Sequence, residues 1–133
     1  MSNALNVQVD GDHYKKQKMQ PIELAYLIGA TPCFTKLAKY ITRDKGDRNI
    51  NLDKAIHCIS IEKEISGQAY TLISESYNIF TNYKGKEQAF MLIDIFSEDE
   101  DIRFALKYML QRDYTRAIEH VVKFKDRMNG SDQ

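Results

Sequence analysis

A few basic residues in the first half of the chain are spaced as an anion-binding site would require. Lys39 and Arg43 are four residues apart, so on a helix they project from the same face. Lys54, on the next predicted helix, can meet them across a helical hairpin. Arginine offers phosphate oxygens a planar pair of donors, and lysine offers a point charge. The spacing predicts a phosphate site built from side chains, although a solvated helix face has the same pattern.

Histidine, tyrosine and aspartate residues extend this candidate site. Histidine can transfer a proton near neutral pH or donate a hydrogen bond to a phosphate. Tyrosine rings can stack on a nucleobase, but with eight tyrosines in the chain core packing is their ordinary use. The candidate catalytic residues are His13, His57 and Arg43, and the candidate ligand-binding residues are Asp12, Tyr14, Lys39, Tyr40 and Lys54.

The sequence does not indicate a metal centre or a glycine-rich phosphate loop. Its six glycines stand singly, so neither G-x-x-x-x-G-K-[ST] nor G-x-G-x-x-G occurs. Asp53 and His57 supply only two ligands, and Cys33 and Cys58 lack zinc spacing, so we expect no zinc and read both cysteines as reduced core residues. A magnesium ion that arrives with a nucleoside triphosphate needs only one or two carboxylates. Its candidates are Asp12, Asp44, Asp47 and Asp53.

The elements that must position these residues are predicted to be helices, because apolar residues recur at helical spacing from Pro21 onward. We expect an all-α fold of about seven short helices, with Val7 and Val9 allowing a short N-terminal strand. Local signals predict where the helices begin and end. A first helix is expected from Pro21 to Gly29, a second to begin at Thr31-Pro32, and a third to run from Asn51 to Ser66-Gly67. Further helices are expected over 69–80, over 89–96, after a capping box from Ser97 to Glu100, and from Asp113 to Asn129-Gly130.

The two halves of the chain share a weak internal similarity. Lys39-Tyr40 followed by Lys54-Ala55-Ile56 resembles Lys107-Tyr108 followed by Arg116-Ala117-Ile118. Both read as a helix with a Lys-Tyr pair, a charged turn, and a helix that opens on a basic residue. Two related hairpins within one domain, 1–133, explain the similarity, and so does coincidence in a lysine-rich helical chain.

Composition narrows the remaining classes. A length of 133 residues fits one domain. The 19 basic and 19 acidic side chains cancel, which argues against a globally basic nucleic-acid binder. No stretch approaches the length of a membrane span and no signal peptide is visible. We therefore expect a cytoplasmic protein with no membrane partner and without a general affinity for nucleic acid.

Four short motifs, taken in order, resemble a small bacteriophage domain family of unknown function. They are Gly11-Asp12-His13-Tyr14, Gln20-Pro21-Ile22-Glu23, Lys39-Tyr40-Ile41-Thr42-Arg43 and Leu52-Asp53-Lys54-Ala55-Ile56-His57. The resemblance covers about residues 10–65 and leaves 68–133 as a second helical unit. Two positions depart from the family pattern: Thr35-Lys36 stands where Gly-Asn is usual, and Cys58 follows His57 where tyrosine is usual.

The resemblance implies a nucleotide-binding protein, since some members of the family are labelled phage nucleotide kinases. It implies phosphoryl transfer to deoxynucleoside monophosphates without a P-loop, in the cytoplasm of a host cell. Lys39, Arg43 and Lys54 would hold the phosphates and neutralise their charge. The alternative is a non-enzymatic helical adaptor or inhibitor that binds a host protein or sequesters a nucleotide, which the altered motifs would suit. Assembly into a homo-oligomer is left open.

Overall fold

In a computed structural model, which describes residues 19–72 and 85–130, the chain folds into helices and these ranges contain no strand. The prediction of an all-α fold is confirmed. The predicted strand at Val7 and Val9 lies outside the described residues. The helices are α1 (Pro21–Ile28), α2 (Pro32–Thr42), α3 (Arg48–Leu72), α4 (Lys86–Phe96), α5 (Glu100–Leu110) and α6 (Tyr114–Gly130).

Local sequence signals place the ends of the first two helices as predicted. Pro21 and Pro32 stand in the first turns of α1 and α2, where the missing N–H costs no hydrogen bond. The Thr31 side chain caps α2 by accepting the Phe34 N–H at 3.2 Å. Gly29 ends α1 with φ 76° and ψ 43°, a left-handed conformation that glycine adopts without strain.

The third helix departs from the prediction at both ends. It begins at Arg48 rather than after Asn51, because the Asp47 carboxylate accepts the Asn49 and Ile50 N–H groups at 2.9 and 3.2 Å. Asn51 is buried inside the helix and donates to the Lys45 carbonyl at 2.8 Å. The helix also continues through Gly67 to Leu72, since a single glycine costs only about 1 kcal/mol.

The predicted capping box at Ser97 is two residues too early. Ser97 instead closes α4, where its N–H donates to the Ile93 carbonyl at 3.1 Å. Asp99 is the cap of α5 and accepts the Ile102 N–H at 3.1 Å. Serine and aspartate are both good caps, so sequence alone did not choose between them. The predicted ends at Asp113 and Gly130 match α6. The rest of the helix expected over 69–80 lies outside the described residues beyond Leu72.

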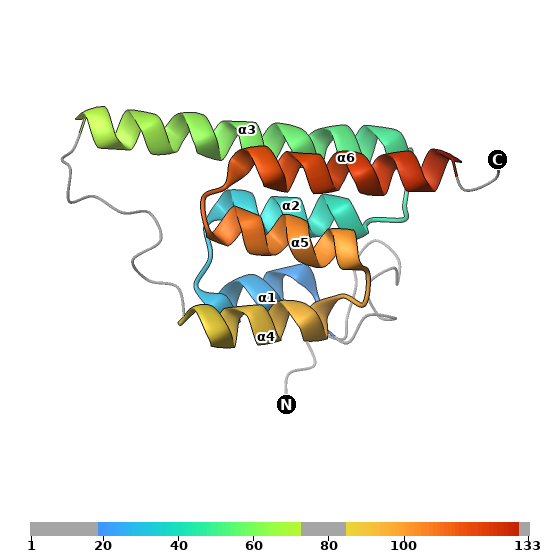
Figure 1. Cartoon of the computed structure of the whole chain (residues 1–133), viewed down its shortest axis with the longest axis horizontal. Coiled ribbons are helices and arrows are strands. Elements are labelled where there is room, and N and C mark those ends of the chain that lie inside the picture. Colours follow the sequence, from blue (N-terminus) through green and yellow to red (C-terminus); the bar gives the residue numbers. More distant parts are fainter. Residues whose placement is uncertain (1–18, 73–84, 131–133) are drawn as a thin grey trace.

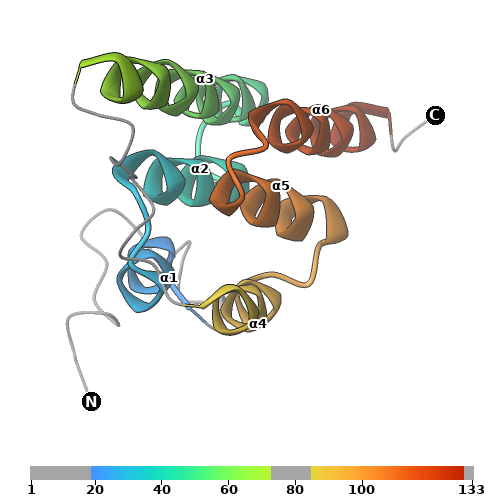
Figure 2. The same cartoon turned by 60° about the vertical axis from the view of Figure 1, so that its left-hand side comes forward.

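The helices stack in three layers of two (Figures 1 and 2). In these layers α1 packs beside α4, α2 beside α5, and α3 beside α6. The two helices of each layer run in opposite directions along the bundle (Figure 1). Consecutive helices α2 and α3 form one long hairpin, and α5 and α6 form another. Each half of the chain therefore contributes one helix to every layer.

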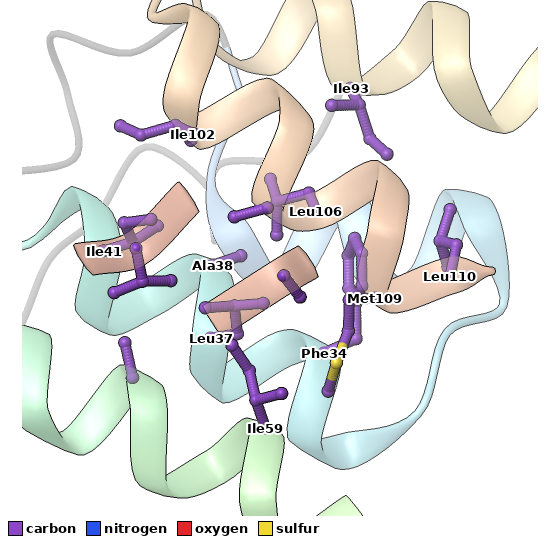
Figure 3. Packing of buried hydrophobic residues seen from close by; sticks show 14 of the residues in the cluster. Phe34, Leu37, Ala38, Ile41, Ile59, Ile93, Ile102, Leu106, Met109 and Leu110 are labelled. Carbon is purple, nitrogen blue, oxygen red and sulfur yellow. The ribbon is translucent and has the colours of Figure 1, made fainter. Parts of the chain in front are cut away.

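The core is centred on the middle layer, because α2 and α5 have helices both above and below them (Figure 2). Their inward faces are apolar and fully or almost fully buried (Figure 3). These residues are Phe34, Leu37, Ala38 and Ile41 on α2, and Ile102, Ala105, Leu106 and Met109 on α5. The other edge of α2 is polar and lies along α3. The candidate site is on this edge.

Arg48 closes the turn between α2 and α3. Its guanidinium donates to the Arg43 carbonyl and, at 3.2 Å, to the Ile41 carbonyl, so it satisfies groups that the end of α2 leaves unpaired. The Arg48 Cζ also lies 5.1 Å from the centroid of the Phe124 ring on α6.

We expect Arg48→Ala to lower the free energy of unfolding by about 1.5 kcal/mol, because two carbonyls lose a charged donor. Urea unfolding followed by circular dichroism measures the change. Lys123→Ala, which removes an exposed charge from α6, is the matched control and should have little effect. Equal stability of the Arg48 variant and the wild type would contradict a capping role.

Candidate functional site

Two ammonium groups from different helices meet at the ring of Tyr40. Tyr40 lies half-buried on α2 and faces α3. The Nζ atoms of Lys39 on α2 and Lys54 on α3 each lie 5.6 Å from its ring centroid. A cation–π attraction therefore holds an ammonium group of each helix beside this one ring. Three residues that the sequence marked separately are thus neighbours in space.

A groove runs between α2 and α3 on either side of this ring, and we call it the α2–α3 groove. One hollow, of about 380 Å³, is lined by Lys36, Tyr40, Lys54, His57 and the two cysteines. A second, of about 290 Å³, is lined by Tyr40, Arg43, Lys54 and residues of the turn before α3. The two hollows share Tyr40 and Lys54, so they form one continuous surface.

Among the described residues, the basic side chains of this groove form no ion pair. No ion pair within residues 19–72 and 85–130 involves the four cations that line or border it: Lys36, Lys39, Arg43 and Lys54. One carboxylate, that of Asp47, does line the smaller hollow. The Asp47 carboxylate caps α3, and the Asp53 carboxylate accepts Lys125 Nζ of α6 at 2.8 Å. The groove is therefore ready to accept an anion.

Two free cysteines form part of the groove wall. Cys58 is buried and Cys33 is half-buried, in line with the reading of both as reduced residues. Burial raises the pKa of both thiols, and the Glu62 carboxyl adds to the effect at Cys33. Both remain protonated thiols near neutral pH, and a thiol is a weak nucleophile. The groove chemistry thus depends on its cations rather than on cysteine.

The structure brings together five of the eight residues that the sequence indicated: Lys39, Tyr40, Arg43, Lys54 and His57. Asp12, His13 and Tyr14 lie outside the described residues. Lys36 is an addition, because the sequence placed it only on a polar helix face. Its spacing from Tyr40 and Arg43, four and then three residues, was the signal that all three share one face of α2.

The part of the chain that the structure describes holds neither a cluster of metal ligands nor a membrane-spanning helix. No three histidine, cysteine, aspartate or glutamate side chains there gather closely enough to hold a metal ion. No helix there combines the length and apolar character needed to cross a bilayer.

Comparison with family models, curated proteins and solved structures finds no match to this chain. The resemblance to the phage family therefore stays a prediction. The case for a function rests on the groove itself.

Proposed function

We propose that the α2–α3 groove binds the phosphate groups of a nucleotide. The observation that carries the proposal is the convergence of Lys39, Arg43 and Lys54 around Tyr40 without a carboxylate partner among the described residues. Arg43 and Lys54 line the same hollow, so one phosphate can accept hydrogen bonds from both. A groove of this charge favours a compact anion over a neutral ligand.

The groove also offers a place for the base and sugar. The larger hollow is bounded by Pro32, Ile61 and the Tyr40 ring, which gives a nucleobase apolar contact. His57 lies on its rim, one helical turn beyond Lys54, where an imidazole N–H can donate to a phosphate oxygen. Nucleotides combine these two requirements, whereas inorganic phosphate satisfies only the first.

Phosphoryl transfer between nucleotides is the activity that the family resemblance adds. In such a reaction negative charge spreads over the transferring group, and fixed cations lower the barrier by neutralising it. Lys39, Arg43 and Lys54 would do this, and His57 would hold a phosphate oxygen in place. Magnesium would arrive with a nucleoside triphosphate, and Asp47, which lines the smaller hollow, could supply a carboxylate ligand to it.

Calorimetric titration with the four 2′-deoxynucleoside monophosphates and triphosphates tests the proposal. We expect at least one to bind with a dissociation constant of about 1 mM or lower, since two or three charged contacts each contribute about 1.5–3 kcal/mol. The matching nucleosides, which lack phosphate, should give no measurable heat. Transfer is then measured by chromatography of a monophosphate incubated with a triphosphate and magnesium. Failure of every phosphate compound to bind would contradict the proposal.

The alternative function, a non-enzymatic adaptor or inhibitor, has one observation in its favour. Ile22 and Tyr26 on α1 are 51% and 82% exposed, and Met91 on the neighbouring α4 is 58% exposed. Exposed apolar side chains on adjacent helices are typical of a surface that meets another protein. Binding of nucleotide without transfer of phosphate would favour the sequestering form of this alternative.

A further inference from the structure

The middle-layer helices of the two halves match position by position. Helices α2 and α5 each have 11 residues, and their caps, Thr31 and Asp99, are 68 residues apart. The same interval relates every buried apolar residue of α2 to a buried residue of α5. The pairs are Phe34 with Ile102, Leu37 with Ala105, Ala38 with Leu106, and Ile41 with Met109.

The outer helices α3 and α6 match in the same way, with an interval of 62 residues. Four of the six buried positions described in α3 fall on buried positions of α6: Leu52 with Tyr114, Ala55 with Ala117, Ile59 with Val121, and Glu62 with Phe124, whereas the counterparts of Asn51 and Cys58 are only partly buried. Matched helices also pack against each other in pairs, in opposite directions, as two copies of one unit would (Figure 1). Amphipathic helices in general bury residues at this spacing, so the register supports two copies only together with matched residue types in the two grooves.

The groove residues have counterparts too. Tyr108 stands at the position of Tyr40, and Arg116 stands at the position of Lys54. Arg116 Cζ lies 5.9 Å from the Tyr108 ring centroid, much as Lys54 Nζ lies 5.6 Å from that of Tyr40. The pair of a tyrosine on the first helix and a cation on the second is thus present in both hairpins.

Aromatic rings fill the second groove. Phe104 replaces Lys36, and its ring centroid lies 4.9 Å from that of His120, which replaces Cys58. The His120 ring also stacks on Tyr108 with centroids 5.6 Å apart. Beneath them His120 Nδ1 lies 3.0 Å from Asp101 Oδ1, where the first half has Cys33. These four side chains occupy the positions that line a hollow in the first half.

Carboxylates also neutralise the cations of the second groove. Asp113, the counterpart of the neutral Asn51, pairs with Arg116 at 3.0 Å. Asp94 pairs with Lys107, the counterpart of Lys39, at 2.7 Å. In the first groove the corresponding lysines have no such partner among the described residues. An anion would therefore meet compensated charge in the second groove and free charge in the first.

We infer that the second half of the chain is a copy of the first whose phosphate groove has been closed. The chain then carries one phosphate site, at Tyr40, and the other groove is closed by Phe104 and Asp113 and has Gln111 where the first half has Arg43. This inference rests on the proposed function of the α2–α3 groove. It goes beyond that function by stating how many phosphate sites the chain has and which side chains determine whether a groove is open or closed.

Calorimetric titration with each 2′-deoxynucleoside triphosphate counts the sites. We expect one equivalent per chain. Lys54→Ala should weaken binding about 10-fold, because one charged contact is lost. Arg116→Ala, the matched change in the second half, should alter the dissociation constant less than twofold. Two equivalents, or equal losses in the two variants, would overturn the inference while leaving the proposed function intact. A wild-type chain that binds none of the four compounds would instead contradict the proposed function.

The triple variant Phe104→Lys/Gln111→Arg/Asp113→Asn gives the second groove the residues that the first has at these positions, Lys36, Arg43 and Asn51. Asparagine caps a helix as well as aspartate, so the start of α6 is preserved. We expect the titration to rise from one equivalent to two, with a circular dichroism melt confirming that the variant is folded. A folded triple variant that still binds one equivalent would overturn the assignment of Phe104, Gln111 and Asp113 as the residues that distinguish the second groove from the first.

Discussion

Replacing Arg43 and Lys54 together by alanine should weaken nucleotide binding about 100-fold, because each cation contributes a charged hydrogen bond and neither forms an ion pair among the described residues. The loss should be smaller at high salt, where the attraction of the intact groove is already screened. Both side chains lie at the protein surface rather than in the core, so the fold should be kept. Calorimetric titration at low and high salt measures the effect.

The control for this variant removes the same charge from other surfaces. Lys63 and Lys123 are exposed, on the far side of α3 from Lys54 and on α6 respectively. The double variant Lys63→Ala/Lys123→Ala should bind nucleotide within about twofold of the wild type, since distant exposed charges are screened. Similar losses in the two double variants would mean that net charge, not the groove, attracts the ligand.

Helix positions could be predicted from the sequence because their signals are local. Thr31-Pro32, Gly29 and Asp113 each act within one turn of their own helix end. The predictions failed where two local signals compete. Asp47 and Asn51 were both acceptable caps, and Asp47 prevailed because its carboxylate reaches two N–H groups while Asn51 is needed inside the helix.

The candidate site was predictable only in part, because its properties depend on contacts between distant segments. That Lys54 lies across a helical hairpin from the basic residues of α2 could be predicted, and in the structure Lys54 and Arg43 line the same hollow. The charge balance of the groove could not be predicted, since it depends on the ion pair of Asp53 with Lys125, which lies 72 residues away on another hairpin. The internal similarity likewise became informative only once burial could be compared position by position.

Glu62 shows the same limit, because nothing in its sequence context indicates a buried carboxyl. It is 2% exposed, on the face of α3 that packs against the bundle. One carboxyl oxygen accepts the Thr31 hydroxyl, and the other makes no hydrogen bond. The buried Tyr114 hydroxyl lies close by and also has no hydrogen bond of normal geometry.

Burial raises the pKa of Glu62, and the Thr31 hydroxyl only partly offsets the effect. The unfolded chain therefore releases this proton at a lower pH than the folded chain. As pH rises above the ordinary glutamate value, near 4.3, the unfolded state gains from ionisation first and the folded protein loses stability. The loss ends once the pH passes the folded-state pKa. Glu62 thus weakens the fold at neutral pH and has no such cost in acid.

Glu62→Gln should raise the free energy of unfolding at pH 7.5 by about 2 kcal/mol, because the amide fills the same space without a charge to desolvate. Its carbonyl can still accept the Thr31 hydroxyl, and its NH₂ can donate to Tyr114. The difference from the wild type should shrink toward pH 4.5, where the wild-type carboxyl is protonated in the folded state. Urea unfolding at the two pH values measures it, with exposed Glu64→Gln as the control. A Glu62 variant less stable than the wild type at pH 7.5 would show that the fold depends on an ionised carboxylate, which the burial of this group argues against.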